Sequence, residues 1–394
     1  MKKSINDNPQ LLLNLFKAYY DARRHKGLSA NVLAFSADYE SKLFKLYEDI
    51  LDRRYVIGPS VCFIVNRPVK REIFAADFRD RVVHHLIFNY LNPIVERDFI
   101  KDSYSCRLGK GTSYGVRRVN HFLHSCSENY THECWIMKLD IRGYFMSMNK
   151  DILYGKVKEV VDKARNISFD KELLMYLVNK VVYHDPVTNC RIKGDRSDWV
   201  GLPKSKSLFF AEKNRGFPIG NLTSQLFGNI YMNRFDHIIK EDHNFKHYGR
   251  YVDDMIFVHK DKGTLASTIP IVKKYLFEEL GLELHTKKIY LQPSAVGVSF
   301  LGAYIKRWCQ YVGKKTKTNC YTRISRWNSE VNKNSYDKFL SSMNSYLGFM
   351  SQYDTYRLRQ KVMSKLSRQI VSKLIISKDF SSIKINSAAN TLRT

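Results

Sequence analysis

Apolar residues recur every three or four positions through much of the chain, with charged residues between them. In residues 10–55 this spacing predicts a helical N-terminal region, with Leu43, Leu46 and Ile50 on one face. The same spacing predicts further helices from about residue 79, over 113–125, from just after Gly220 to Phe235, and near 265–280. Helical periodicity therefore accounts for most of the long elements.

Shorter apolar runs predict strands between these helices. Residues 61–65 and 71–74 predict a β-hairpin around Asn66-Arg67-Pro68, and another strand is expected near 298–305. Residues 185–215 are polar and irregular, which predicts a long loop or insertion. The mixture of helices and strands indicates an α+β fold.

Composition and charge add two expectations. A chain of 394 residues is too long for one small core, so two or three subdomains are expected. The net charge of +27 indicates a polyanionic partner, because Lys and Arg neutralise phosphates. After Ile305 there are 18 Lys or Arg against 4 Asp or Glu, and Phe339, Met343 and Leu347 keep helical spacing. A small basic helical domain is therefore expected at the C-terminus.

The sequence gives no sign of a membrane or of an oxidising compartment. The seven cysteines are scattered without a CxxC pair, which is typical of reduced thiols. No apolar run approaches the ~18 residues of a membrane span, and the first residues lack the apolar stretch of a signal peptide. A cytoplasmic protein without a membrane partner is therefore expected.

Three acidic residues stand at the ends of apolar strands. Residues 135–139 predict a strand that ends at Asp140, and Asp253-Asp254 lies at the expected bend of a second hairpin. If these strands are neighbours in one sheet, three carboxylates converge at one edge, where hard oxygen ligands suit Mg²⁺. An ordinary turn pair is the alternative for Asp253 and Asp254. The apolar flanks of both acidic sites favour the metal site.

The motifs around these acids, in their order along the chain, resemble those of reverse transcriptases. The matching segments are Leu139–Phe145 and Tyr251–Asp254 (palm motifs), 79–85 (fingers), 281–288 (after the catalytic hairpin) and Phe300-Leu301-Gly302 (primer-grip turn). The resemblance covers about residues 60–305. It implies a right-hand polymerase with fingers (1–135), a palm of antiparallel sheet plus helices (136–305) and a basic helical thumb (306–394).

The resemblance also implies the chemistry, which is RNA-directed DNA synthesis with two Mg²⁺ ions or, as a substitute, Mn²⁺. Two such ions ~3.5–4 Å apart activate a 3′-hydroxyl and stabilise the leaving pyrophosphate. The implied catalytic metal ligands are Asp140, Asp253, Asp254 and the Ile141 carbonyl. Phe145 matches the aromatic residue that excludes a ribose 2′-hydroxyl, with a plain core aromatic as the alternative. The implied basic contacts to the incoming dNTP are Lys70 and Arg79 (alternatives Arg71 and Arg81), and Lys288 (or Lys287) for pyrophosphate.

One motif departs from most of the family. Many reverse transcriptases carry Gln-Gly-x-x-x-Ser-Pro where this chain has Ile219-Gly220-Asn221-Leu222-Thr223-Ser224-Gln225. This pattern resembles diversity-generating retroelements of the group II intron-like clade, whose products carry errors opposite template adenines. By resemblance, Ile219 and Gly220 contact the incoming nucleotide, and Ile219, Ser224 and Gln225 affect template reading and fidelity. Ile219 replaces an amide and Gln225 a rigid Pro, so a wrong base pair would be rejected less strongly.

The implied partners are an RNA template, a primer or cDNA, dNTPs and a small basic accessory protein that forms a pentamer. Two alternatives stay open: a reverse transcriptase of retron or phage-defence type, and a catalytically silent nucleic-acid-binding protein of the same fold. The segment from Ile219 to Gln225 argues against the first. The three intact carboxylates argue against the second.

Overall fold

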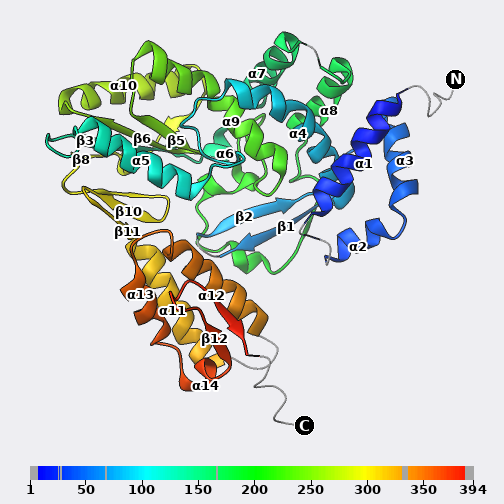
Figure 1. Ribbon diagram of the computed structural model, residues 1–394. Coiled ribbons are helices and arrows are strands. Elements are labelled where there is room, and N and C mark those ends of the chain that lie inside the picture. Colours follow the sequence, from blue (N-terminus) through cyan, green and yellow to red (C-terminus); the bar gives the residue numbers. More distant parts are fainter. Residues whose placement is uncertain are drawn as a thin grey trace, which may run out of the picture. The chain divides into compact units, whose positions relative to one another are not determined.

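The chain folds into two compact units. The computed structural model describes residues 8–24, 26, 29–66, 69–165, 167–330 and 336–386 (Figure 1). The first unit comprises Met1–Leu108, Lys138–Met255 and Ser267–Ile289, and the second comprises Gly109–Met137, Ile256–Ala266 and Tyr290–Thr394. In these described ranges no helix is long and apolar enough to cross a membrane. The division into fingers, palm and thumb stays a prediction.

The N-terminal region of the first unit is helical, which confirms the prediction from its apolar spacing. It contains α1 (Pro9–Arg23), α2 (Ala30–Ser36) and α3 (Tyr39–Leu51), and α1 packs along α4 (Phe78–Asp98) (Figure 1). Helix α4 confirms the helix predicted from about residue 79. Asp77, the residue before the helix, accepts a hydrogen bond from the Arg79 N–H at 3.0 Å with its side chain and so caps the helix.

The predicted hairpin after these helices is present as β1 (Ser60–Val65) and β2 (Arg71–Ala75), paired antiparallel. Arg67 and Pro68, at the predicted bend, lie outside the described residues. The segment 185–215, expected to be an irregular loop, also contains β4 (Cys190–Ile192), which pairs parallel with β1, and three short 3₁₀ turns.

One buried carboxylate explains why this segment is ordered. Glu72 on β2 is fully buried, and it accepts hydrogen bonds from the indole of Trp199 (2.6 Å), the hydroxyl of Ser207 (2.7 Å) and the N–H of Leu208 (2.6 Å). Three donors offset the cost of burying the charge. Glu72 therefore fastens the segment to the hairpin.

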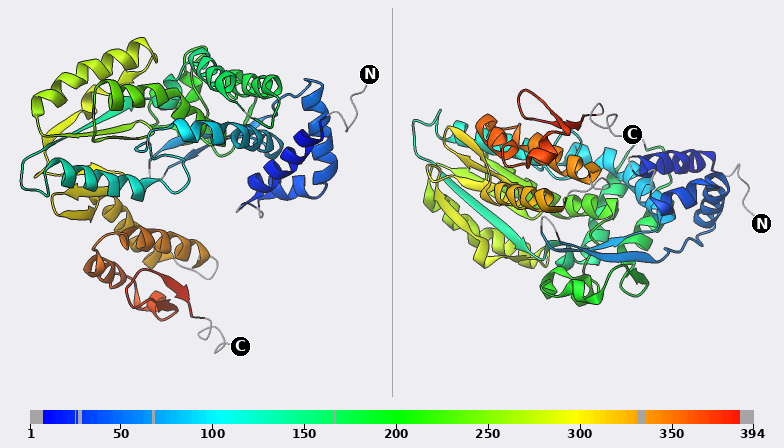
Figure 2. Two further views of the ribbon diagram at one scale, coloured as in Figure 1. Left: turned by 45° about the horizontal axis from the view of Figure 1, so that its top comes forward. Right: turned by 90° about the horizontal axis from the view of Figure 1, so that it is seen from below.

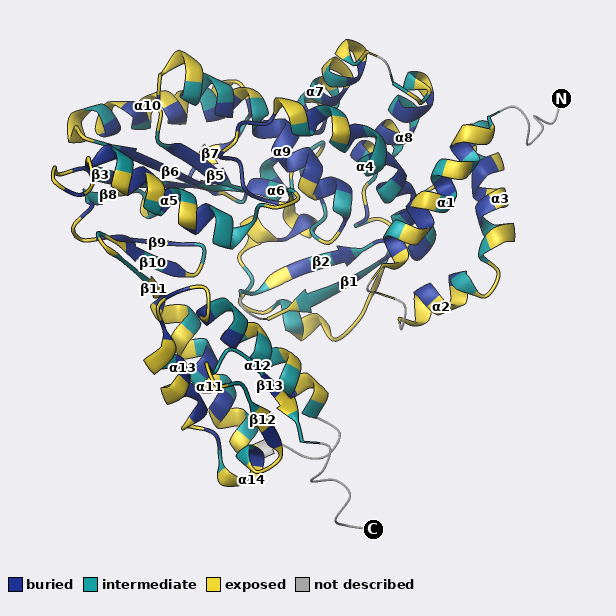
Figure 3. Cartoon of the chain, viewed as in Figure 1, coloured by how far each residue is buried: buried dark blue, intermediate teal, exposed yellow. Residues whose placement is uncertain are grey.

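The acidic motifs lie in a five-stranded sheet of order β5-β6-β3-β7, with β8 also paired to β3. Its strands are β3 (Trp135–Arg142), β5 (Tyr248–Tyr251), β6 (Asp254–His259), β7 (Glu283–Leu284) and β8 (Tyr290–Pro293). The helices along this part of the chain are α6 (Tyr144–Ser147), α7 (Lys150–Lys163), α8 (Lys171–Tyr183), α9 (Leu222–His237) and α10 (Lys262–Glu278). Helix α9, predicted to end at Phe235, is buried along most of its length (Figure 3).

The second unit contains the C-terminal basic region and several strands that the sequence did not predict. Its helices are α5 (Thr112–Cys126), α11 (Lys314–Glu330), α12 (Tyr336–Met350), α13 (Tyr356–Met363) and α14 (Arg368–Val371), and its strands outside the large sheet are β9 (Val298–Phe300), β10 (Ala303–Lys306), β11 (Cys309–Val312), β12 (Leu374–Ile376) and β13 (Ile383–Ile385). Strand β13 contacts α12 (Figure 2). The C-terminal region is therefore helical with an added two-stranded sheet.

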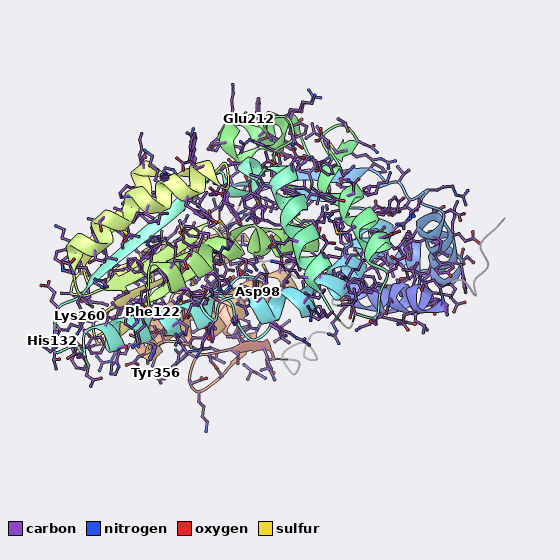
Figure 4. The ribbon with its side chains drawn as sticks, turned by 90° about the horizontal axis from the view of Figure 1, so that it is seen from above. Asp98, Phe122, His132, Glu212, Lys260 and Tyr356 are labelled. Atoms are coloured by element: carbon purple, nitrogen blue, oxygen red, sulfur yellow. The ribbon has the colours of Figure 1, made fainter. Side chains whose placement is uncertain are left out.

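Two local features of the second unit follow from particular residues. The single strand predicted near 298–305 is broken by Leu301 and Gly302, whose positive φ angles of 50° and 87° turn β9 into β10. Lys260 and His132 lie near one another (Figure 4): Lys260 forms an ion pair with Glu128, and His132 Nδ1 lies 3.4 Å from the same carboxylate.

Candidate active site

Asp140 lies near the end of β3, held from both backbone and side chain. Its carbonyl accepts a hydrogen bond from the His285 N–H at 2.8 Å, and its carboxylate is buried. The strand continues two residues past Asp140, to Arg142, because Ile141 and Arg142 still pair with β7. Gly143 then turns the chain with a φ of 56°. Asp140 is therefore fixed within the sheet rather than at its frayed end.

Asp253 and Asp254 lie at the turn between β5 and β6, next to β3. Val252 and Asp253 form the turn, and Asp254 is the first residue of β6. The carbonyl of Asp253 accepts a hydrogen bond from the Ile141 N–H at 3.2 Å. The structure therefore brings together the three acids that the strand pattern places at one edge.

The three carboxylates interact electrostatically. Burial, followed by the negative charges of Asp254 and Asp140, raises the pKa of Asp253 to about 6. Lys138 lies 3.0 Å from Asp254 and forms an ion pair with it. Sequence reasoning missed Lys138, although its position two residues before Asp140 puts both side chains on the same face of β3.

The Lys288 side chain forms an ion pair with the Asp140 carboxylate. Its ammonium lies 2.9 Å from each oxygen of the Asp140 carboxylate. Burial acts to lower the pKa of Lys288, but the hydrogen bonds and negative charge of Asp140 outweigh it and raise the pKa. Lys287, the sequence alternative, is exposed. Of the two lysines, the geometry singles out Lys288.

Phe145 and Ile219 lie on the same apolar cluster. Both are partly buried and pack against the buried side chains of Cys62, Phe74 and Met146. The Ile219 carbonyl accepts a hydrogen bond from the Phe74 N–H at 2.9 Å, so the segment before α9 lies against β2. An apolar wall therefore lies between the β-hairpin and α6.

Gly220 makes this close approach to β2 feasible. It has a φ of 131°, and a Cβ at this position would lie 3.0 Å from both the Ile73 side chain and the Phe74 carbonyl. A larger residue would therefore be strained in backbone conformation and also crowded by β2.

The first turn of α9 contains two buried polar residues, Thr223 and Ser224, and one exposed polar residue, Gln225. Thr223, between Leu222 and Ser224, lies 2.7 Å from the ring Nδ1 of His84 on α4. Burial lowers the pKa of His84 to about 3, so this contact is made by a neutral imidazole. Of Ser224 and Gln225, only Gln225 is exposed and so accessible to a template.

The basic residues predicted to contact a triphosphate are engaged with protein groups. Lys70 donates to the Val200 carbonyl at 2.6 Å. Arg79 forms an ion pair with Asp49 at 2.8 Å and donates to the Val56 carbonyl at 3.0 Å. These contacts bring neither side chain together with Asp140, Asp253 or Asp254.

Arg71 and Arg81, the alternative triphosphate contacts, differ in their exposure and in their partners. Arg81 donates to the Ala76 carbonyl at 2.9 Å, and burial lowers its pKa. Arg71 is exposed, and its positive charge opposes the rise in the pKa of Tyr251 that burial causes. Arg71 is therefore the basic residue of this group that lies near Tyr251, the last residue of β5.

Known proteins show similarity to this chain in both sequence and structure. Residues 70–305 match the family described as reverse transcriptase (RNA-dependent DNA polymerase). Protein YkfC of Escherichia coli (strain K12) is 29% identical over 163 residues, which are 41% of this chain and 35% of that protein. The chain therefore spans about a third of the length of this relative.

Solved telomerase structures resemble the chain at low sequence identity. Telomerase from Candida albicans in complex with a fragment of telomeric RNA has a TM-score of 0.48 and 12% identity, covering 86% of this chain and 60% of that chain. Apo telomerase from Candida tropicalis, truncated from the C-terminal domain, has a TM-score of 0.46 and 14% identity, covering 65% and 56%. The family match, in contrast, spans more than half of the chain and includes Asp140, Asp253 and Asp254. The chain therefore belongs to the reverse transcriptase (RNA-dependent DNA polymerase) family.

Proposed function

We propose that the chain is an RNA-directed DNA polymerase that copies a template-repeat RNA into cDNA, with adenine-directed errors, in a diversity-generating retroelement. The proposed polymerase activity rests on one observation, that Asp140, Asp253 and Asp254 lie together at one edge of the five-stranded sheet. The raised pKa of Asp253 reports both its burial and its repulsion from the other two carboxylates. The charge of Asp253 is therefore unfavourable in this setting, and a bound cation would stabilise it.

In this proposal the three carboxylates hold two Mg²⁺ or Mn²⁺ ions. Among the residues that the structure describes, no group of three or more His, Cys, Asp or Glu side chains is placed to hold a metal ion, and Lys138 and Lys288 contact Asp254 and Asp140 instead. Mg²⁺ keeps waters and takes substrate phosphates as further ligands, so the proposed site includes ligands beyond these side chains. When bound, such ions activate a 3′-hydroxyl and stabilise the leaving pyrophosphate. Asp140, Asp253 and Asp254 would hold them, with the Ile141 carbonyl as a further ligand.

Lys288 supplies a proton and a positive charge beside these acids. Its raised pKa keeps the ammonium protonated at neutral pH. Released from Asp140, this ammonium would bind the phosphates of the incoming nucleotide and protonate the departing pyrophosphate. General acid catalysis of this kind contributes about 10²–10⁴-fold to a rate.

The apolar wall of Phe145 and Ile219 forms the sugar and base side of the nucleotide pocket in this proposal. The Phe145 ring excludes a 2′-hydroxyl by its bulk, which selects dNTPs over ribonucleotides. Lys70 and Arg79 would have to leave Val200 and Asp49 to reach a triphosphate. Arg71 needs no such release, because it is exposed near Tyr251.

The retroelement assignment rests on the segment from Ile219 to Gln225. An Ile side chain offers no hydrogen bond to the nucleotide. Its packing against the buried side chains of Cys62, Phe74 and Met146 supports an apolar contact instead. Exposed Gln225 adds a flexible side chain where a rigid Pro is usual. Both features lower the penalty for a mispaired template base. The RNA template, the primer and a small basic pentameric accessory protein are the partners in this proposal.

Primer extension tests the polymerase activity. The purified chain, a defined RNA template, a DNA primer, dNTPs and Mg²⁺ should give cDNA, whereas Asp253→Asn should give none. Absence of synthesis by the unaltered chain, with and without the accessory protein, would leave a nucleic-acid-binding protein of the same fold.

Sequencing of the cDNA tests the retroelement assignment. Errors should concentrate opposite template adenines, and Ile219→Gln should reduce them while Ile219→Val, which stays apolar, should not. An even error spectrum, or one that Ile219→Gln leaves unaltered, would favour a reverse transcriptase of retron or phage-defence type.

A further inference from the structure

A buried ion pair outside the three acids contacts the turn Val252-Asp253 between β5 and β6, which is the catalytic turn of the proposed function. Asp236 on α9 and Arg250 on β5 have side chains that are 1% and 0% exposed. The Arg250 guanidinium donates from Nε to Asp236 Oδ1 at 2.8 Å and from Nη2 to Oδ2 at 2.6 Å. The hydroxyl of Tyr248 also donates to Asp236 Oδ1, at 2.7 Å. The carboxylate is therefore saturated with donors and its orientation is fixed.

The remaining arm of Arg250 reaches the catalytic turn. Its Nη1 donates to the Val252 carbonyl at 3.0 Å. Val252 has a φ of 57°, the left-handed region that a β-branched residue rarely adopts. The Val252 carbonyl belongs to the peptide that leads into Asp253, so the hydrogen bond orients that peptide and the carboxylate that follows it.

The backbone of Arg250 is held as firmly as its side chain. Its N–H donates to the Asp102 carbonyl at 2.8 Å, and its carbonyl accepts from the Tyr104 N–H at 2.9 Å. Gly249 has no room for a side chain, because a Cβ there would lie 2.1 Å from the Tyr104 hydroxyl. The guanidinium thus projects from a fixed backbone and is not free to follow a relaxing turn.

We propose that Asp236 and Arg250 are positioning residues for the polymerase reaction: they hold Val252 in its left-handed conformation and so set the place of Asp253 and Asp254. Because Asp236 lies in the last turn of α9, the pair also ties the turn to the C-terminal end of that helix. This inference rests on the proposed function of the three acids as metal ligands.

A role in stability alone predicts a different behaviour. Replacing a buried ion pair by apolar residues of similar size is often neutral or stabilising, since two charges no longer have to be desolvated. If the pair served only the core, Arg250→Met with Asp236→Leu would keep both fold and activity. A positioning role predicts that the fold survives while catalysis falls.

The decisive variant is Arg250→Lys, which keeps the charge and loses the forked donor to Val252. We expect kcat to fall by about 10²-fold, as misplacement of a reacting group by about 1 Å does, with KM for dNTP within about twofold. Arg359→Lys is the matched control. Arg359 is also a buried arginine that donates to a backbone carbonyl, that of Asp379, but it lies in the second unit. It should leave kcat unaltered.

Rescue separates positioning from folding. Adding Val252→Gly to Arg250→Lys should recover kcat by about fivefold or more, because Gly adopts a positive φ without the guanidinium. Recovery does not follow if Arg250 merely supports the core. Wild-type kcat in Arg250→Lys, or loss of activity that tracks loss of fold without rescue by Val252→Gly, would overturn the proposal. If the double variant Arg250→Met with Asp236→Leu does not fold, the rescue by Val252→Gly still tests the positioning role.

A second readout does not depend on polymerisation. Mn²⁺ should raise the unfolding temperature of the wild-type chain, and Arg250→Lys should need several-fold more Mn²⁺ for the same shift, whereas Arg359→Lys should not. If the wild-type chain, Arg250→Lys and Arg359→Lys all need the same Mn²⁺ concentration for this shift, the proposal is also overturned. If the wild-type chain makes no cDNA but shows this Mn²⁺ pattern, the polymerase assignment fails and the positioning of the turn stands.

Discussion

The basic side chains of the β1–β2 and α4 region and those of the sheet edge meet very different partners. Lys70, Arg79 and Arg81 each donate to a backbone carbonyl. Lys138 and Lys288 instead lie 3.0 and 2.9 Å from the carboxylates of Asp254 and Asp140. The first group joins segments of the fold. The second group neutralises acids that the proposed chemistry requires.

The difference shows why a basic residue near a motif is a weak indication of substrate binding. A guanidinium that bonds a carbonyl and a structural carboxylate loses those bonds when it turns toward a phosphate, and hydrogen bonds to charged groups contribute about 1.5–3 kcal/mol each. In the proposed site, a metal ion that displaces an ammonium from a carboxylate keeps that carboxylate neutralised, and the released ammonium can bind a phosphate instead. The two groups should therefore respond differently to substitution.

The largest expected effect is at Asp253, where activity and stability should change in opposite directions. Asp253→Asn should lower kcat by about 10³-fold or more, because a ligand of the proposed metal ions is lost. Without divalent metal the same variant should unfold at a higher temperature, since burial and two neighbouring carboxylates disfavour the Asp253 charge. Primer extension and thermal unfolding in EDTA measure the two effects.

Asp242→Asn is the matched control, because Asp242 is exposed and lies outside the sheet. It should alter neither quantity. A lower unfolding temperature for Asp253→Asn in EDTA would mean that the carboxylate is part of a stabilising network, and that the edge is not repulsive as proposed.

How much of this site follows from sequence depends on the range of the interaction. Helices such as α9 and α12 follow from apolar spacing, and the three acids stand out because strands end beside them. The break at Leu301-Gly302 and the hairpin β12–β13 were not predicted, because each depends on backbone turns that apolar periodicity does not encode.

Side-chain partners are the least predictable part. The sequence marks Lys288 by resemblance but does not distinguish it from Lys287, and only the position of the 3₁₀ turn Thr286–Lys288 puts one of them on Asp140. The contact between Arg250 and Asp236 joins a strand to a helix, so neither residue carries a signal of it. Pairings of this kind are fixed by tertiary structure.

Lys288→Ala should have the second-largest effect. We expect kcat to fall by about 10²-fold, because the variant lacks the proposed proton donor to pyrophosphate. Lys287→Ala is the control at the neighbouring exposed position and should keep kcat within about twofold. Single-turnover primer extension measures both, and equal losses in the two variants would remove the assignment of the proton to Lys288.

Arg79→Ala tests the other side of the comparison. It should lower the free energy of unfolding by about 1–3 kcal/mol, since the bonds to Asp49 and Val56 are lost, while KM for dNTP changes less than about twofold. Arg71→Ala should instead raise KM for dNTP and leave the free energy of unfolding nearly unaltered, because Arg71 is exposed near Tyr251. If Arg79→Ala raises KM tenfold without loss of stability, Arg79 is the triphosphate contact that the sequence resemblance implies.

The smallest effect per residue is expected on the basic surface of the second unit. Arg357, Lys361 and Lys365 are exposed, and their combined replacement by Gln should reduce the slope of log K for RNA binding against log salt by about 2–3, or roughly 0.7–0.9 for each phosphate that the protein no longer neutralises. Lys158, Lys163 and Lys274 in the same assay are the control, because each already pairs with a carboxylate four residues away. A salt dependence that the first triple variant does not alter would place the RNA on a different surface, and the excess charge after Ile305 would then serve another polyanion.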